Sequence, residues 1–358
     1  MEENKSEQIK DFKDISWQVT EEEYRADPNL SYSTLASFKR GGVDCIPKLF
    51  DKIESPSLTF GGAVDSIMTG GMDEFNSRYA IAEFPKIGEK PLKVVKELFE
   101  TYKETYNDLV RIPSANIIEV LNKYDYRSNA ADAKRVEGIL REGETYYQEL
   151  IKSNGKIILS KEDWLEVANT VRVLKSSKLT KGLFAENNPW EKGDMQRYYQ
   201  LKFKSKFKAT DDSPEIAYRV MADLIIVDYD KKIVYPFDLK TSGHPEYKFY
   251  ESFKTWCYDI QARLYWATIR QNMDNDPYFK DFKLADYQFI VINKKSLTPM
   301  LWLYPDTKRL YDSIELNDGT VLTSPLVIGE ELSAYLKENR TIPFGINIDG
   351  INNINDWI

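Results

Sequence analysis

The chain contains few of the residues on which many enzyme classes depend. Its 358 residues include one histidine, His244, and two cysteines, Cys45 and Cys257. A single histidine argues against Ser–His–Asp hydrolases and His-rich zinc enzymes. Two cysteines exclude a disulfide framework and four-Cys zinc or iron–sulfur sites. Any chemistry must therefore rest mainly on carboxylates, lysines or hydroxyls.

Targeting and motor sequences are also lacking. No apolar run approaches the roughly 20 residues that a membrane helix requires. The polar, acidic start MEENKSEQIKDFKDIS lacks the basic and apolar segments of a signal peptide. The chain has no Walker A sequence, G-x-x-x-x-G-K-[ST], so no fused ATP motor is expected. We therefore expect a cytoplasmic protein that does not enter a membrane.

Composition and local patterning predict a folded α/β protein. Hydrophobic residues make up 42% and aromatic residues 13% of the chain, which fits a globular core. Helical spacing dominates residues 92–185, and the pattern changes near residue 195 to period-two and β-rich runs. We expect one domain, 1–358, made of an N-terminal helical part (1–90), a helical insertion (91–190), an α/β core (191–305) and a C-terminal extension (306–358).

Two predicted strands bring acidic residues together. The segment AYRVMADLIIVDYDKKIVYPFDLKT reads as a hairpin, and a turn centred between Asp230 and Lys231 would set Asp223 opposite Asp238. Their Cβ atoms would then be about 5 Å apart. Lys240, two residues after Asp238, shares its face of the strand. A register shift of one residue would move Asp223 to the other face, and an ordinary hairpin with an Asp–Lys ion pair is the alternative interpretation.

Two carboxylates that face each other among apolar residues are expected to bind a cation. Asp223 and Asp238 would repel each other, and apolar neighbours at 221–225 would solvate them poorly. A divalent cation relieves both problems, and hard oxygen ligands select Mg²⁺ or Mn²⁺. Pro236, within the second strand, suggests an edge or a bulge where pairing is interrupted.

A helix is predicted at about 247–272, directly after the second strand. Gln261 and Tyr265 lie four residues apart and share one face of it. Apolar residues form a neighbouring stripe that should bury against the sheet. Thr241 and Ser242, near the end of the second strand, are candidates for a phosphate hydrogen bond or a helix cap.

A basic stripe is predicted in the first strand after residue 195. The net charge of −8 counts mildly against nucleic-acid binding, although a local patch matters more than the total. In the strand LKFKSKFKA, the residues that point to one side are Lys202, Lys204, Lys206 and Lys208. They would form either a solvated edge that resists aggregation or a stripe that follows DNA phosphates.

These elements together resemble a known superfamily. The series Asp223, Asp238-Leu239-Lys240 and Gln261-x-x-x-Tyr265 is similar to the PD-(D/E)xK nucleases, within them the RecE- and RecB-like (lambda-exonuclease-type) phage exonucleases. PFDLKTS and YDIQARLYW carry this match. Upstream, LTFGGAVDSIMTGGMDEFNSRYAIAEFP resembles the G-x-x-x-H helix and the stretch after it, with Asp65 where the family usually has His. The resemblance covers about 57–86 and 195–300.

The resemblance implies a restriction-endonuclease-like core, a central mixed sheet flanked by helices, with a large helical insertion. It implies a Mg²⁺-dependent deoxyribonuclease, with Mn²⁺ able to substitute. Asp223, Asp238 and the Leu239 carbonyl would bind the metal. Asp65, where the family usually has His, would be a further oxygen ligand or, alternatively, would cap its helix or face solvent. Lys240 would serve the attacking water, while Gln261 and Tyr265 would support the site and the DNA.

The implied activity is 5′ to 3′ exonuclease digestion of linear duplex DNA in phage recombination or replication. The implied partners are DNA, a single-strand annealing protein and further copies of the chain in a homo-oligomer. Two alternatives stay open. One is a structure-specific or restriction-type endonuclease on the same fold, and the other is a non-catalytic DNA-binding or phage structural protein.

Overall fold

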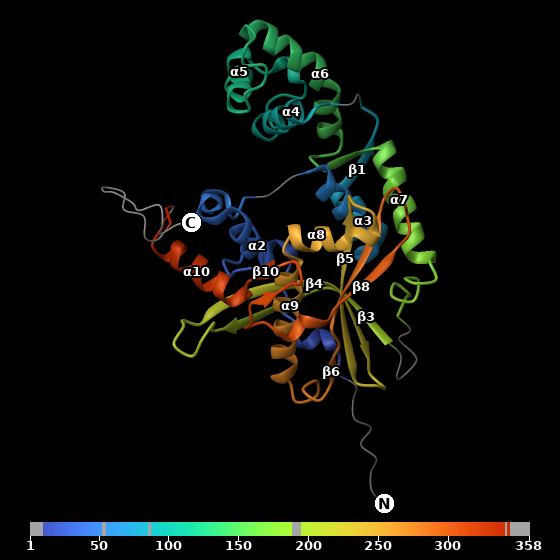
Figure 1. The fold of residues 1–358 in the computed structure, drawn as a ribbon. Helices are drawn as coiled ribbons and strands as arrows, with labels where there is room; N and C mark the ends of the chain where they lie inside the picture. The colour runs from blue at the N-terminus through green and yellow to red at the C-terminus, as the bar shows by residue number, and fades with distance from the viewer. Residues whose placement is uncertain (1–9, 52–54, 85–86, 188–194, 341, 344–358) are drawn as a thin grey trace, which may run out of the picture. The chain divides into compact units, whose positions relative to one another are not determined.

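The computed structural model describes residues 10–51, 55–84, 87–187, 195–340 and 342–343 (Figure 1). The chain divides into two compact units. The first combines 1–55 with 173–358, and the second is Pro56–Arg172. The helical segment that the sequence delimits at 91–190 overlaps the second unit, which begins earlier and also includes the helix of Asp65. Residues 344–358 of the predicted C-terminal extension lie outside the described residues.

A mixed sheet forms the centre of the first unit, with strand order β3-β4-β5-β7-β8 and β6 paired to β5. Strands β3, β4 and β5 run antiparallel in succession, β7 and β6 are parallel to β5, and β8 is antiparallel to β7. The six strands are β3 (Met195–Phe207), β4 (Ile216–Asp228), β5 (Ile233–Ser242), β6 (Lys283–Leu284), β7 (Tyr287–Asn293) and β8 (Met300–Tyr304). The predicted α/β class, a mixed central sheet flanked by helices, is confirmed.

Helices of the first unit pack with this sheet through one large hydrophobic core. Helix α9 contacts β3, β4 and β7, and α10 contacts β4 and α2. The helices are α1 (Glu21–Ala26), α2 (Tyr32–Gly41), α8 (Phe249–Thr255), α9 (Tyr258–Asp274) and α10 (Pro325–Lys337), with short 3-10 turns at Phe12–Ile15, Gly42–Lys48, Glu246–Lys248 and Pro305–Lys308. A small hairpin, β9 (Ile314–Glu315) and β10 (Val321–Leu322), precedes α10.

The second unit is mainly helical and has its own hydrophobic core. Two short parallel strands, β1 (Tyr79–Ala82) and β2 (Ile157–Ser160), accompany the helices. The helices are α3 (Pro56–Arg78), α4 (Glu89–Tyr102), α5 (Ser114–Lys123), α6 (Asp132–Lys152) and α7 (Lys161–Ser176), which crosses the boundary between the units; a 3-10 turn lies at Leu109–Arg111. Gly143 lets α6 approach α4 closely, because a Cβ there would lie 2.4 Å from Val95 Cγ2.

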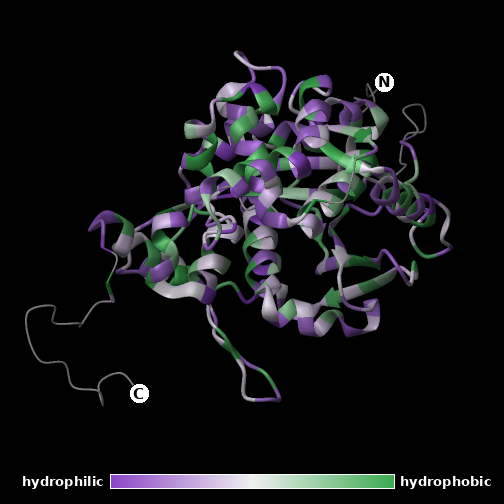
Figure 2. Cartoon of the chain, turned by 90° about the horizontal axis from the view of Figure 1, so that it is seen from above, coloured by the Kyte–Doolittle hydropathy of each residue, from purple (hydrophilic) through white to green (hydrophobic). Residues whose placement is uncertain are grey.

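Amphipathic patterning accounts for most of these elements. Figure 2 shows helices that carry both hydrophilic and hydrophobic residues along their length, as expected of elements that bury one face. In β3 the alternation is strict over Leu201–Lys206, with every second residue buried. By contrast, residues 224–228 of β4 are all buried, which is typical of an interior strand. Within the described residues, no helix is long and apolar enough to cross a membrane.

Two local expectations need correction. The single helix predicted at about 247–272 is two helices, α8 and α9, because Cys257 adopts a left-handed conformation with φ of 55°. Pro236 was expected at an edge or bulge, but it lies in an interior strand and pairs with Ile225. On the other flank of β5, Pro236 has no ladder partner, because β6 pairs with β5 only as far as Val234 and the pairing of β5 with β7 begins at Phe237. The missing N–H therefore removes no hydrogen bond from either ladder on that flank.

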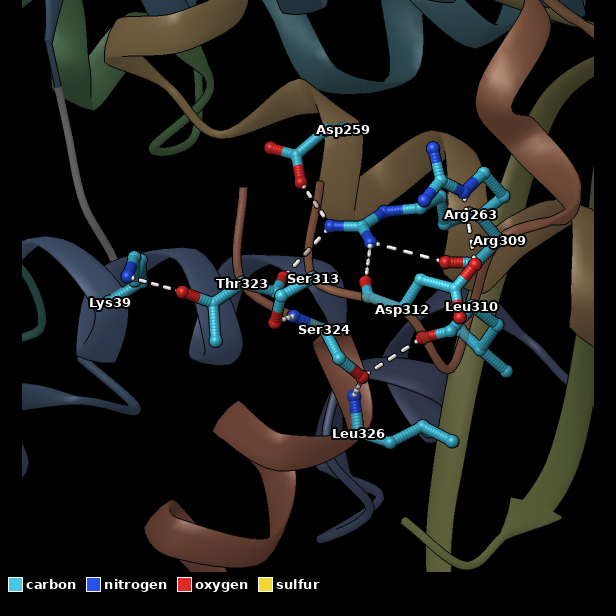
Figure 3. Close-up of polar contacts among 10 residues, drawn as sticks. All are labelled: Lys39, Asp259, Arg263, Arg309, Leu310, Asp312, Ser313, Thr323, Ser324 and Leu326. Atoms are coloured by element: carbon cyan, nitrogen blue, oxygen red, sulfur yellow. Dashed lines mark hydrogen bonds and ion pairs between the residues drawn. The ribbon is translucent and has the colours of Figure 1, made fainter. Parts of the chain in front are cut away.

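A buried arginine ties the C-terminal hairpin to α9 (Figure 3). Residues 259–265 of this helix are all buried, so its polar side chains need partners inside the protein. Arg263, with 0% exposure, forms an ion pair with Asp259 at 2.5 Å. It also donates to the backbone carbonyls of Asp312 at 2.7 Å, Thr323 at 2.8 Å and Arg309 at 3.2 Å. One side chain thus holds three points of the segment that precedes α10.

We predict that Arg263→Met lowers the free energy of unfolding by about 3–5 kcal/mol, because it leaves the Asp259 carboxylate buried without its cation. Urea denaturation followed by circular dichroism measures the change. The matched control is Arg309→Met, which removes an exposed arginine paired with Asp312 at 2.9 Å and should change stability little. Equal losses in the two variants would contradict the assignment, as would a failure of Asp259→Leu to restore stability to the Arg263 variant.

Candidate functional site

The candidate site lies where β4 and β5 separate. The predicted hairpin register is confirmed over Leu224–Asp228, with Leu224 opposite Phe237 as the last pair. Beyond that pair, β4 continues beside β3 alone while β5 pairs with β7. Asp223 is the first residue of β4 after the separation. The two strands thus form a fork. The ladder, followed away from the turn, stops at Leu224 and Phe237, so Asp223 and Asp238 would have been the next pair.

Asp223 bridges this fork with its side chain. Its Oδ2 accepts a hydrogen bond of 2.9 Å from the backbone N–H of Leu239. A carboxylate oxygen therefore takes the place of the backbone acceptor that a continued ladder would have supplied. In an extended strand the N–H and C=O of one residue point to the same flank, so the Leu239 carbonyl faces the flank on which Asp223 lies. The fork therefore brings two oxygen atoms that could bind a cation to the same place, one from the Asp223 side chain and one from the Leu239 backbone carbonyl.

A local irregularity in β3 accompanies the fork. The β3–β4 ladder pairs Tyr199 with Leu224 and Leu201 with Ala222, and skips Gln200 and Asp223 between them. Gln200 has φ of 51°, in the left-handed region that is uncommon for residues other than glycine. Sequence reasoning missed Gln200, because nothing in a run of alternating residues signals a left-handed backbone at one of them.

Asp238 is the most buried charge of the site, with 1% exposure. Burying a carboxylate is costly unless hydrogen bonds and opposite charge compensate it. Gln261 of α9 donates to its Oδ1 through Nε2, and the Lys240 ammonium lies 2.8 Å from its Oδ2. The predicted grouping of Asp238, Lys240 and Gln261 is therefore present as direct contacts.

Lys240 is largely shielded from solvent, yet its amine stays protonated. Its side chain is 19% exposed, and Nζ lies 4.5 Å from the ring centroid of Tyr258. Burial acts to lower the pKa of Lys240, but the Asp238 carboxylate acts in the opposite direction and prevails, so the pKa is raised above its ordinary value. The ammonium group is thus protonated at neutral pH and is held between a carboxylate and an aromatic face.

Two buried tyrosines line the same region. The rings of Tyr265 on α9 and Tyr287 on β7 meet edge to face, 6.1 Å apart. Burial raises the pKa of both hydroxyls, and the negative charges of Asp238 and Asp223 raise them further. The sequence predicted Tyr265 through its spacing from Gln261, but it missed Tyr287. Tyr287 reaches the site only because β7 pairs with β5, a long-range contact that no local pattern reports.

The other predicted residues of the β5 end, Thr241 and Ser242, also have partners within the protein. Thr241 pairs with Ile292 of β7 in the ladder. Ser242 Oγ accepts from the N–H of His244 at 3.1 Å, so this hydroxyl caps the turn after β5. The turn is fastened again by Asn293, whose amide donates to the Ser242 carbonyl at 2.9 Å.

The lysine stripe follows β3, at the edge of the sheet, as predicted. Lys204 forms an ion pair with Asp27 at 2.6 Å, and Lys206 pairs with Glu215 at 3.1 Å. Burial is the main cause that lowers the pKa of Lys202. Lys208 follows the strand and donates to the Asp211 carbonyl at 3.4 Å. Asp27, the partner of Lys204, is largely buried, which favours the solvated-edge interpretation for Lys204, whereas the pair of Lys206 with Glu215 is exposed and leaves Lys206 able to contact a phosphate.

The predicted metal ligands fit a hard divalent cation in their chemistry. Asp223, Asp238 and the Leu239 carbonyl are oxygen donors of the kind that Mg²⁺ prefers. The buried Oε1 of Gln261 makes no hydrogen bond within the described part of the chain, so a further oxygen lies beside Asp238. No group of three or more His, Cys, Asp or Glu side chains among the described residues is placed to hold a metal. Asp65 belongs to α3 of the second unit, so its role stays a prediction.

We predict that Tyr287→Phe flattens the loss of stability at alkaline pH. Because the pKa of Tyr287 is raised in the folded state, its contribution is fully present below the ordinary tyrosine pKa of about 10 and is lost as pH rises above it. Removing the hydroxyl should reduce the fall in unfolding free energy by up to about 1.4 kcal/mol per pH unit above pH 10. Urea denaturation between pH 8 and 11 measures this, with the exposed Tyr247→Phe as the control. Parallel curves for wild type and Tyr287→Phe would refute it.

The geometry thus assembles two carboxylates, an ammonium group and a carboxamide from β4, β5 and α9 around one strand fork. Asp238, Lys240 and Gln261 are in direct contact, and Asp223 reaches the same strand through Leu239. Comparison with known proteins adds no relative: no protein-family model matches the chain, and no curated protein matches it.

Proposed function

We propose that the fork is the catalytic centre of a metal-dependent deoxyribonuclease of the PD-(D/E)xK type. The observation that carries this proposal is the buried Asp238, in contact with both Lys240 and Gln261. This pair is costly to bury, and it differs from the buried Arg263–Asp259 pair because it lies at the strand fork that Asp223 bridges and beside Gln261 Oε1, which makes no hydrogen bond within the described residues. The antiparallel β3-β4-β5 series, the α9 crossover and the parallel β7 are compatible with a restriction-endonuclease-like core.

Asp223 and Asp238, together with the Leu239 carbonyl, are the residues that would hold Mg²⁺ or Mn²⁺. When bound, the cation would act as a Lewis acid on a phosphate oxygen and lower the pKa of a coordinated water. The chain's own groups prepare the carboxylates for this task. The Leu239 N–H orients Asp223, and the Gln261 amide orients Asp238, so both oxygens are held before substrate arrives.

Lys240 supplies the positive charge that the reaction needs beside the carboxylates. Its ammonium is protonated at neutral pH and largely shielded from solvent, which strengthens its interaction with a phosphate whose negative charge grows during hydrolysis. It also offers hydrogen-bond donors that can orient the attacking water. Gln261 and Tyr265 complete the wall on the side of α9.

The substrate that fits this proposal is linear duplex DNA, digested 5′ to 3′ from an end. The accompanying proposals are a cytoplasmic location, an annealing protein as partner and a homo-oligomer around the DNA. Duplexes labelled at either 5′ end, incubated with Mg²⁺ or with a chelator, test the activity and its polarity. Cleavage of a covalently closed circle would instead assign an endonuclease. Absence of cleavage together with absence of Mn²⁺ binding in calorimetry would overturn the enzyme assignment.

We predict that Asp238→Ala and Lys240→Ala each reduce Mg²⁺-dependent cleavage by at least about a thousand-fold, because the first removes a proposed metal ligand and the second removes the positive charge beside the reacting phosphate. A labelled linear duplex measures the rate. Lys231→Ala is the matched control, since Lys231 also pairs with an aspartate of the same hairpin, Asp228 at 2.9 Å, but lies at its turn. Circular dichroism must show that each variant is folded. Cleavage at a rate close to that of the wild type by either site variant would contradict the assignment of Asp238 and Lys240 as catalytic residues.

We predict that the double variant Lys206→Glu, Lys208→Glu weakens duplex binding and reduces the slope of log affinity against log salt by about 2, as loss of two phosphate contacts requires. Fluorescence anisotropy in the presence of a chelator measures binding without cleavage. The control reverses the same charges at Lys231 and Lys232, which lie at the opposite end of the β3–β4 pair from Phe207. Equal salt slopes for the wild type and the Lys206 and Lys208 variant would leave the stripe as a solvated edge.

A further inference from the structure

The aromatic face of Tyr258 is the second partner of the Lys240 ammonium. Nζ lies 4.5 Å from the ring centroid and 2.8 Å from Asp238 Oδ2. We propose that Tyr258 is a positioning residue that holds Lys240 in place during the reaction. This inference rests on the proposed nuclease function, but its central contact is testable without it.

Lys240 needs an uncharged second partner, because a divalent cation and the Lys240 ammonium would both draw on the charge of Asp238. A carboxylate that serves a divalent cation compensates the Lys240 ammonium less well, because its charge is then shared with the metal. A second carboxylate beside Lys240 would compete for the same metal. The face of an aromatic ring attracts the ammonium through its quadrupole and carries no net charge. Tyr258 can therefore keep Lys240 in position whether or not Asp238 is engaged.

The ring of Tyr258 is itself held firmly. It stacks on Phe249 of α8, with centroids 5.6 Å apart and planes inclined by 17°, and lies 5.9 Å from the ring of Phe289 of β7. The break between α8 and α9 makes Tyr258 the first residue of α9, directly after the left-handed Cys257. Tyr32 of α2 fixes this break, because its hydroxyl donates to the Trp256 carbonyl at 2.7 Å.

The contact predicts different outcomes for two substitutions. Tyr258→Phe keeps the ring face, so it should retain most of the activity. Tyr258→Leu keeps an apolar side chain but loses the ring, so kcat should fall about ten-fold while KM for DNA changes little. Initial rates on a labelled linear duplex with Mg²⁺ separate the two constants. Phe253→Leu is the matched control, because Phe253 packs on Phe249 and Phe289, as Tyr258 does, whereas the ring that faces the Lys240 ammonium is that of Tyr258.

A spectroscopic readout tests the contact independently of activity. Protein labelled with ¹³C at lysine Cε should show a Lys240 methylene proton resonance shifted upfield by the ring current of Tyr258, in addition to the shifted resonance expected of Lys204, whose Nζ lies 3.6 Å from the Trp17 ring centroid. The disappearance of one shifted resonance in Lys240→Met assigns that resonance to Lys240. The resonance should stay shifted in Tyr258→Phe and in Phe253→Leu, and should move to the ordinary lysine position in Tyr258→Leu.

The two readouts separate the inference from the proposed function. A shifted Lys240 resonance that depends on the ring, in a protein without nuclease activity, would support the positioning contact and overturn the nuclease. Absence of the ring-dependent shift would overturn the positioning role in any case. An active nuclease in which Tyr258→Leu leaves kcat within about two-fold of wild type would also overturn it and leave the proposed function intact.

Discussion

The site depends on the compensation of one buried charge, the carboxylate of Asp238. Its 1% exposure removes most of its hydration, and the loss must be offset inside the protein. Lys240 offsets it from the same strand, and Gln261 offsets it from α9. Because α9 supplies one of the two partners, the position of the helix over the sheet is linked to the charge state of the site.

The separation of β4 from β5 turns an ordinary hairpin into a site. Where the two strands pair, backbone groups satisfy each other, and no donor is available to a side chain. Beyond Leu224 and Phe237 the pairing stops, and the Leu239 N–H takes its acceptor from Asp223 instead. On its opposite flank β5 pairs with β7 from Phe237 onward, and this pairing carries Tyr287 to the site. The end of the β4–β5 pairing and the polar residues of the site therefore lie at the same point of the sheet.

Two buried polar side chains of α9, Arg263 and Gln261, differ in the groups that they contact. Arg263 satisfies Asp259 and three backbone carbonyls, and so serves to fasten the C-terminal hairpin. Gln261, two residues earlier than Arg263, uses its amide N–H on Asp238 and leaves Oε1 without a hydrogen bond within the described residues. Arg263 Nε also makes no hydrogen bond within the described residues, so the two groups differ in what they contact: Arg263 binds the C-terminal segment, whereas Gln261 contacts the buried carboxylate of the site.

The sequence by itself determined the features that depend on local spacing. The hairpin register, the shared face of Asp238 and Lys240, the alternation of β3 and the placement of Gln261 on a helix after β5 all follow from periods of two or 3.6 residues. Only the tertiary structure decided the helix break at Cys257, the interior place of Pro236, and the approach of Tyr258 and Tyr287 to the site. These depend on which distant segments pack together, because contact between residues far apart in the chain is set by burial and strand pairing, which leave no local period to read.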